Sequence, residues 1–362
     1  MSKLHFLVIQ LRQIGDVLIS TTLCETLKRN FPNAQVDYAV YDYTAAVAEN
    51  NPFIDNLLVF PHGFSWRSFG KWRKIITFMR KQHYDYAVDI LNTPKSVYLA
   101  KVAKAKTIIG PQNQKRRSKN YDIQVPFDEH FLTKDEVCIS VKNRLCLLKP
   151  INNEFHYITQ YKLHLTSKEI NSAKRLLDKL NIDHNKPIFF FSPGSRSPQQ
   201  KQWLLDNFIT VIETCIKKHD AQIILYPGPN QLQDCLTIRN KISKPENILI
   251  IENYNLREMA AIIKLCTLFV GNDSGASHIA IAVGTPSITI FSPAIWHHDW
   301  HFATHPQHLA ITAQTLLGVN DTDYEKLLLE QTTEQTQKLY QLIEPNIVET
   351  KIQQFMNNGY FA

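Results

Sequence analysis

The sequence predicts an α/β protein with two doubly wound parallel-sheet domains of the Rossmann-like kind, facing across a cleft. Three observations lead to this prediction. Short apolar runs alternate with helical patterns in both halves of the chain. The length of 362 residues suits about two domains, and a hydrophobic content of 44% supplies two cores. Breaks in the pattern at Pro150 and at Asn152 and Asn153 separate the two halves.

In the first half, five apolar runs are expected to form parallel strands, at residues 4–11, 36–40, 57–60, 86–91 and 107–109. Helical patterns are expected near residues 17–30, 67–82 and 95–104. Polar residues interrupt the first apolar run well below the roughly 20 residues that a membrane span needs. We therefore expect this run to be the first strand and not a signal segment.

The second half repeats the scheme, with strands expected at 188–192, 222–226, 248–251, 267–270 and 287–291, and helices near 167–181, 203–218, 255–265 and 275–283. Two further helical segments, about 322–343 and 345–357, follow the last strand and are expected to pack back across the domains. We divide the chain into an N-terminal domain (1–160), a C-terminal domain (161–342) and a C-terminal helix (343–362). That helix is expected to pack on the N-terminal domain.

The six cysteines are scattered and form no CxxC pair, which is typical of free thiols in the reducing cytoplasm. Charge is distributed unevenly along the chain, whose formal net charge is +7. Between Asp55 and Asp122 the only acidic residues are Asp85 and Asp89, whereas lysine and arginine are frequent. This region is expected to attract a phosphorylated or carboxylated partner; the alternative is a solvated basic face without a partner.

The stretch from Gly271 to Phe291 predicts an anion site, because an apolar strand runs into a polar turn and then a short helix. Backbone N–H groups and the positive end of the dipole at the helix start favour a diphosphate there. Ser274 adds a hydroxyl, Asp273 can accept from sugar hydroxyls, and His278 lies one turn further on. The alternative is that Asp273 or Ser274 only caps the helix and that His278 belongs to the core.

The loop after the first strand carries a candidate general base. Gly15 permits a tight turn, and Asp16 opens the following helix, where its carboxylate could accept a proton from an attacking hydroxyl. The alternative is a helix N-cap. With one glycine, the loop lacks the GxGxxG pattern of dinucleotide sites, so an NAD-linked function loses support.

Two more loops follow strands of the second half. Gly194 and Ser195 offer hydrogen-bond donors, and Lys201 can place an ammonium on a phosphate; the alternative is an ordinary polar loop. Glycine is too sparse here for a GxxxxGK[ST] loop, so ATP hydrolysis is not indicated. The segment YPGPNQ, residues 226–231, is a candidate neighbour of a nucleobase, although its prolines mark a turn more securely.

In this order and at these separations, the segments LRQIGDVLISTTLCETLKRNFPNAQVDY, PGSRSPQQKQW and GNDSGASHIAIAVGTPSITIFSP resemble the ADP-heptose:lipopolysaccharide heptosyltransferases, glycosyltransferase family 9. The resemblance spans roughly Lys3 to Pro293 and implies a GT-B fold, inversion at the anomeric carbon, ADP-heptose as donor, and neither a metal nor another cofactor. It implies Asp16 as the general base. It implies that the donor is held by Ser195, Lys201, Asp273, Ser274, Gly275 and His278.

The resemblance also implies an anionic acceptor, the lipopolysaccharide core of Kdo and heptose on lipid A, reached by peripheral contact with the cytoplasmic face of the inner membrane. The candidate acceptor-binding residues are Arg12, Arg67, Lys71, Lys115, Arg116 and Arg117. No nucleic-acid partner is expected, because the chain has no recognisable nucleic-acid module. Two alternatives remain: transfer of another nucleotide-activated sugar, and a nucleotide-sugar-binding protein without catalysis.

Some segments depart from the family pattern. Gln231 and Gln233 stand in a loop where family members often carry an acidic residue, which leaves the nucleoside contact open. After Pro293 comes a histidine-rich segment, which we expect to be a substrate-facing or interdomain loop and not a metal cluster; it contains His297, His298, Asp299, His301, His305 and His308. Asp321 and Asp323 form a DxD sequence that is expected to cap a helix.

Overall fold

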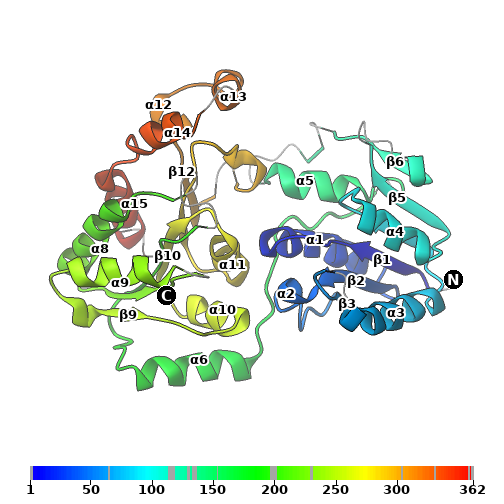
Figure 1. The fold of residues 1–362 in the computed structure, drawn as a ribbon, viewed down its shortest axis with the longest axis horizontal. Helices are drawn as coiled ribbons and strands as arrows, with labels where there is room; N and C mark the ends of the chain where they lie inside the picture. Colours follow the sequence, from blue (N-terminus) through cyan, green and yellow to red (C-terminus); the bar gives the residue numbers. More distant parts are fainter. Residues whose placement is uncertain are drawn as a thin grey trace. The chain divides into compact units, whose positions relative to one another are not determined.

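The chain divides into two compact units, with the boundary between His164 and Leu165 (Figure 1). The computed structural model describes residues 3–63, 66–112, 119–128, 131–132, 137–152, 154–195, 202–228, 231–302, 305–329, 332–357 and 359. Each unit contains a six-stranded sheet in which the paired strands are parallel, flanked by helices. The predicted α/β class with two doubly wound parallel sheets is therefore confirmed.

In the first unit the strand order is β3-β2-β1-β4-β5-β6. The strands are β1 (His5–Ile9), β2 (Gln35–Tyr41), β3 (Asn56–Phe60), β4 (Tyr86–Asp89), β5 (Thr107–Pro111) and β6 (Ile123–Val125). The helices are α1 (Ile14–Asn30), α2 (Asp42–Ala45), α3 (Trp66–Lys81), α4 (Pro94–Val102) and α5 (Ile139–Cys146). The short β6, α2 and α5 were not predicted from the sequence.

The apolar run HFLVI forms β1 because a central strand of a parallel sheet is covered on both faces and has almost no polar side. The helix after it, α1, is buried along most of its length, and α5 packs on it. The two helices therefore hold the loop after β1 against the body of the unit.

In the second unit the strand order is β12-β11-β10-β7-β8-β9. The strands are β7 (Ile188–Ser192), β8 (Gln222–Leu225), β9 (Ile248–Ile250), β10 (Leu268–Asn272), β11 (Ser287–Ile290) and β12 (His308–Ile311). The helices are α6 (Ser167–Lys179), α8 (Leu205–His219), α9 (Leu232–Lys241), α10 (Leu256–Lys264), α11 (Gly275–Val283), α12 (Ala313–Leu317), α13 (Asp321–Leu329), α14 (Thr333–Tyr340) and α15 (Pro345–Asn357). The helical segment predicted at 322–343 thus contains two helices, α13 and α14.

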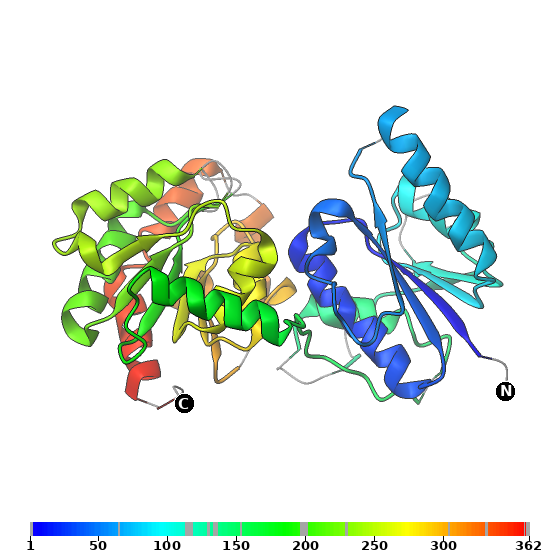
Figure 2. The same cartoon turned by 90° about the horizontal axis from the view of Figure 1, so that it is seen from below.

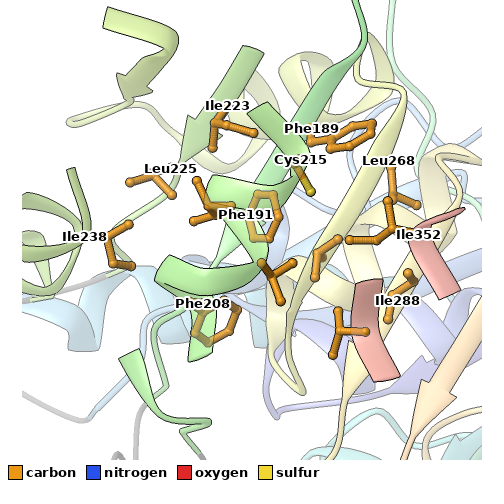
Figure 3. Packing of buried hydrophobic residues seen from close by; sticks show 14 of the residues in the cluster. Phe189, Phe191, Phe208, Cys215, Ile223, Leu225, Ile238, Leu268, Ile288 and Ile352 are labelled. Atoms are coloured by element: carbon orange, nitrogen blue, oxygen red, sulfur yellow. The ribbon is translucent and has the colours of Figure 1, made fainter. Parts of the chain in front are cut away.

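The core of the second unit is rich in phenylalanine from β7 and in aliphatic side chains from its neighbours (Figure 3). The last helix, α15, packs on α8 and adds Val348, Ile352 and Phe355 to this core. The expectation that residues 343–362 pack on the first domain is corrected accordingly, since the second unit buries the apolar face of α15.

All six cysteines are buried free thiols, as predicted. Among the described residues, no helix combines the length and the apolar character needed to cross a bilayer.

Candidate active site

In both sheets, the loops that carry candidate residues lie close to the point where the strand order reverses. In each, the first strand of the unit lies where the strand order reverses, so β1 lies between β2 and β4, and β7 between β8 and β10. Ligands of open α/β sheets bind at this point, beyond the carboxyl ends of the strands. Arg12 and Asp16 follow β1, Ser195 follows β7, and residues 273–278 follow β10. In each unit by itself, the predicted residues therefore lie at the position where such sheets bind ligands.

Asp16 lies in the first turn of α1 and is only 6% exposed. The residue at the N-cap position is Gln13, whose side chain makes no capping hydrogen bond. The alternative interpretation of Asp16 as the helix N-cap is therefore wrong. Its carboxylate instead bonds across the first unit to Arg144 on α5.

The partner of Asp16 is a buried guanidinium. Arg144 Nη2 lies 2.6 Å from Asp16 Oδ1, and both side chains are less than a tenth exposed. Arg144 Nε donates to Ser20 Oγ at 2.9 Å, and Nη1 donates to the Ser140 carbonyl at 2.8 Å. Ser20 Oγ in turn donates to the Asp16 carbonyl at 2.7 Å and accepts from Gln10 Nε2 at 2.9 Å. This network fixes the rotamer of Asp16.

The second carboxylate oxygen, Asp16 Oδ2, makes no hydrogen bond to any residue that the structure describes. A carboxylate that is held through one oxygen keeps the other for a proton or a ligand. Sequence reasoning missed Arg144. A signal in the sequence could have pointed to it. Arg144 stands three residues after Val141, on the apolar face of the helix at 139–146, and both residues are buried.

An aromatic group lies near the loop after β1. Tyr43 Oη donates to the Arg12 carbonyl at 3.2 Å. The His62 ring meets Tyr41 and Tyr43 edge-on, with 5.0 Å between ring centroids in each pair. Lys95 Nζ lies 5.9 Å from the centroid of the Tyr41 ring. Rings and cations in this arrangement suit an anionic or sugar ligand.

The remaining acceptor candidates are only partly described. The Arg12 side chain is exposed in the loop after β1, and Lys71 is exposed on α3. Arg67 lies on α3, but its side chain is outside the described part of the chain. Lys115, Arg116 and Arg117 also lie outside the described residues.

In the second unit, α11 begins directly after the carboxyl end of β10, with Ser274 at the N-cap position. Ser277 Oγ accepts from the Ser274 N–H at 3.2 Å and donates to the Ser274 carbonyl at 2.7 Å. The Ser274 hydroxyl is buried and faces the Ser277 N–H in a capping box, although it forms no hydrogen bond of full geometry in the described structure. The alternative that Ser274 caps the helix therefore agrees with the structure, and the other amides at the helix start can still bind an anion.

Asn272 connects the loops that follow β7 and β10. Its Oδ1 accepts from the Trp203 N–H at 3.0 Å, and its Nδ2 donates to the Pro193 carbonyl at 2.7 Å. Gly271 permits the close contact of these strands, because a Cβ atom there would lie 2.7 Å from the Ser192 carbonyl oxygen. Asn272 was not predicted as a site residue, although it adjoins the predicted Asp273.

Ser195 is buried, and its carbonyl accepts a short hydrogen bond from Gln231 Nε2. The Gln231 side chain reaches this carbonyl by crossing Gly194, where a Cβ atom would lie 1.9 Å from Gln231 Oε1. Gln231 therefore shapes the loop after β7. The predicted phosphate ligand Lys201 lies outside the described residues.

His278 is buried on α11, and its ring makes a T-shaped contact with Trp300 at 6.1 Å between centroids. His297, His301 and His308 are also buried. Burial lowers the pKa of His297 to about 3, of His301 to about 4 and of His308 to about 3. These three rings are neutral packing elements of the second unit. That the segment containing them is a substrate-facing or interdomain loop stays a prediction.

Within the described ranges, no group of three or more His, Cys, Asp or Glu side chains is arranged to hold a metal ion. The DxD sequence was expected to cap a helix. Asp321 and Asp323 lie instead inside the first turn of α13, and the cap is Asn320, whose Oδ1 accepts from the Asp323 N–H at 2.9 Å.

Comparison with known proteins agrees with this geometry. The family model described as glycosyltransferase family 9 (heptosyltransferase) matches residues 72–301. Lipopolysaccharide heptosyltransferase 3 of Escherichia coli (strain K12) is 28% identical over 80% of this chain and 83% of its own length. The glycosyltransferase family 9 structure from Veillonella parvula has a TM-score of 0.81 at 16% identity, covering 98% of this chain and 97% of its own. The Escherichia coli heptosyltransferase WaaC with ADP has a TM-score of 0.70 at 14% identity, covering 97% and 100%.

Proposed function

Because this chain belongs to glycosyltransferase family 9, the heptosyltransferase family, we propose that it transfers L-glycero-D-manno-heptose from ADP-heptose to the inner core of lipopolysaccharide. A relative that is named a lipopolysaccharide heptosyltransferase supports the acceptor class. A similarly folded heptosyltransferase solved with ADP supports the nucleotide. The reaction inverts the anomeric carbon, because the acceptor oxygen attacks on the face opposite the departing ADP.

The observation that carries this proposal is the position of Asp16. It is buried at the reversal point of the first sheet, and within the described part of the chain its carboxylate is hydrogen-bonded through Oδ1 and not through Oδ2. A sugar hydroxyl is a poor nucleophile, so a base must take its proton while the new C–O bond forms. We assign this proton to Asp16 Oδ2. Arg144 is a positioning residue, since it acts on the substrate only through Asp16.

The second unit binds the donor in this proposal. The amides at the start of α11 and the Ser274 hydroxyl hold the diphosphate together with Ser195 and Lys201. Asp273, Gly275 and His278 bind the remaining phosphate and the heptose. The departing ADP gathers negative charge, which the helix start and the Lys201 ammonium stabilise, so the reaction requires neither a metal ion nor another cofactor.

The acceptor binds to the basic first unit, through Arg12, Arg67, Lys71, Lys115, Arg116 and Arg117. The charge balance around these residues supports an anionic acceptor. Asp85 is paired with Lys106 at 2.8 Å, and Asp89 is fully buried and accepts from Tyr121 Oη at 2.8 Å. Neither of these carboxylates is therefore available to repel an anion. The acceptor is a glycolipid, so we place the enzyme at the cytoplasmic face of the inner membrane in peripheral contact, without a nucleic-acid partner.

The test compares Asp16→Asn with the wild-type protein, because asparagine retains an oxygen for Arg144 but cannot take a proton. We expect turnover of ADP-heptose with a truncated core acceptor to fall by about 10²- to 10⁴-fold, while the calorimetric Kd for ADP stays unchanged. Glu25→Gln is the matched control, because Glu25 is another buried acid on α1 and is paired with Arg29. Wild-type turnover in Asp16→Asn would overturn the assignment of the base.

The same assay separates the two alternatives. Release of nucleotide from a different sugar donor, with ADP-heptose inert, would show transfer of another sugar. Tight binding of ADP-heptose without release of ADP under any acceptor would show a binding protein. Mass spectrometry of core oligosaccharide from cells with and without the gene then identifies the heptose that is added.

A further inference from the structure

Helix α3 presents two different faces. Trp72 and Met79 point into the core of the first unit, with Ile75 and Ile76 packed beside them. Most of the remaining positions face solvent. The first turns of α3 extend beyond the rest of the first unit (Figure 2). We call the exposed side of this helix the α3 face.

Large aromatic side chains are exposed on the α3 face. Trp66 is 81% exposed, Phe69 is 54% exposed and Phe78 is 37% exposed. Exposing the large apolar surface of a tryptophan ring to water is unfavourable. The amphipathic ring is favoured where water meets an apolar phase. The α3 face therefore has the aromatic component of an interfacial helix.

The charges on the same face are of one sign. No acidic residue occurs between Trp66 and Lys81. The exposed cations Lys71, Arg73, Lys74 and Lys81 form no ion pair with a carboxylate in the described part of the chain. Three lysines elsewhere in this unit, Lys28, Lys106 and Lys149, are each paired with an aspartate. The uncompensated charge favours an anionic partner.

A hollow extends this surface onto the edge of the sheet. It has a volume of about 510 Å³ and lies between α3 and the edge strand β3. Its lining combines apolar side chains, among them Val59, Ile75 and Phe78, with the polar residues Lys74, Asn56 and Asp55. The Asp55 carboxylate is paired with Lys28. Apolar side chains therefore reach the sheet edge beside Lys74 and a carboxylate that already has a cationic partner.

We propose that the α3 face is a membrane-docking surface that binds bilayers containing anionic phospholipid. Arg73, Lys74 and Lys81 contact lipid phosphates. Trp66 and Phe69 enter the interface between headgroups and acyl chains. This inference rests on the proposed function in one respect, because an enzyme with a glycolipid acceptor must reach that acceptor at the membrane surface. Binding to vesicles is nevertheless measured without sugar transfer.

The experiment measures partition of the full chain onto vesicles of phosphatidylethanolamine with phosphatidylglycerol, and onto neutral phosphatidylcholine vesicles. We expect Trp66→Ser with Phe69→Ser to weaken binding to the anionic vesicles by about ten-fold. Lys74→Gln with Lys81→Gln is expected to weaken it by about ten-fold or more, and added salt to weaken it further. Lys168→Gln with Lys174→Gln, which removes two exposed charges from α6, is the matched control and leaves binding unchanged.

Transfer assays separate this inference from the proposed function. With a delipidated core acceptor in solution, the Trp66 and Phe69 variant is expected to work at the wild-type rate, and with acceptor in vesicles to work more slowly. Vesicle binding that all variants share, or that neutral vesicles match, would overturn the docking surface. Preferential binding of single-stranded RNA by the same residues would also overturn it. Vesicle binding without any sugar transfer would refute the proposed function alone.

Discussion

At the scale of single residues, the geometry of Asp16 depends on Arg144. One guanidinium contacts the Asp16 carboxylate, the Ser20 hydroxyl and the Ser140 carbonyl. The planar guanidinium can contact three acceptors at once, whereas a lysine ammonium on a flexible chain is a single point charge. Both partners of the ion pair are buried, so removing the Arg144 charge would leave the Asp16 carboxylate in the interior without its ion-pair partner.

Arg144→Lys keeps the charge beside Asp16 but cannot reproduce all three contacts. We expect kcat to fall by about ten-fold or more, because misplacing a catalytic group by about 1 Å is enough for such a loss. The KM for ADP-heptose is expected to stay unchanged, since the donor binds to the second unit. Steady-state release of ADP measures both constants.

Arg29→Lys is the matched control, because Arg29 pairs with Glu25 on the same helix but is mostly exposed. Urea unfolding of each variant tests whether the fold survives. A correctly folded Arg144→Lys protein with wild-type kcat would show that Arg144 serves stability alone.

Asp16 could be predicted from the sequence because its whole context is local, a strand followed by a glycine turn and a helix. Arg144 could not be predicted as its partner. The two residues are 128 positions apart, and only the packing of α5 on α1 joins them.

At the scale of elements, the strand-turn-helix from β10 to α11 depends on close contact between neighbouring strands. Gly271 lies beside Ser192 in the ladder between β10 and β7. A Cβ atom at position 271 would lie 2.7 Å from the Ser192 carbonyl oxygen and 3.1 Å from Phe269 Cζ. The backbone of a central strand cannot move away at low cost, because it is hydrogen-bonded on both sides.

Gly271→Ala is therefore expected to lower the free energy of unfolding by about 1–3 kcal/mol, as other overpacked cores do. It is also expected to weaken ADP binding, because Asn272 and Ser274 follow directly on the displaced strand. Urea unfolding and calorimetric titration measure the two effects. Gly70→Ala is the control, since nothing lies within 4 Å of the added Cβ and α3 gains helix propensity. Equal stability of both variants would contradict this account of the strand contact.

The long elements could be predicted because their patterns are strong. The run IFFFS at residues 188–192, in which the first four residues are apolar, forms β7 with the predicted bounds. β6 and β12 were missed because a polar residue stands in each short run, Gln124 in β6 and His308 in β12, whereas the equally short β9 is wholly apolar and was predicted. The position of α15 could not be predicted, because an amphipathic helix does not specify which core covers its apolar face.

At the scale of the whole molecule, the two units repeat one plan. Each has six strands, and each carries its candidate residues at the point where the strand order reverses. The sequence order of the loops predicted this plan, because strand alternation and loop chemistry repeat in both halves. Among the described residues, the second unit differs from the first in burying histidine side chains, and the sequence did not predict their burial. The second unit buries His297, His301 and His308, which lie in the segment predicted to be a substrate-facing or interdomain loop.

These histidines make the stability of the whole chain depend on pH. Their pKa values in the folded protein, about 3 for His297 and His308 and about 4 for His301, lie below the ordinary value of 6.5. As the pH falls below 6.5, the unfolded chain therefore takes up protons before the folded chain does. The stability is complete above about pH 6.5 and declines toward the folded pKa values. At about pH 5 each histidine is expected to cost about 2 kcal/mol.

His301→Phe tests this expectation with little change of shape. The phenylalanine ring keeps the contacts with Phe291 and Phe302. It removes the buried Nε2, which has no hydrogen-bond partner in the described structure. It also loses the hydrogen bond between His301 Nδ1 and the Phe302 carbonyl. Urea unfolding, followed by the fluorescence of the buried Trp203, is compared at about pH 7.5 and about pH 5. We expect the variant to lose about 2 kcal/mol less than the wild type on acidification, because one titrating group is gone. His156→Phe, which replaces an exposed histidine, is the control. The same acid sensitivity in His301→Phe and the wild type would show that other groups limit stability at low pH.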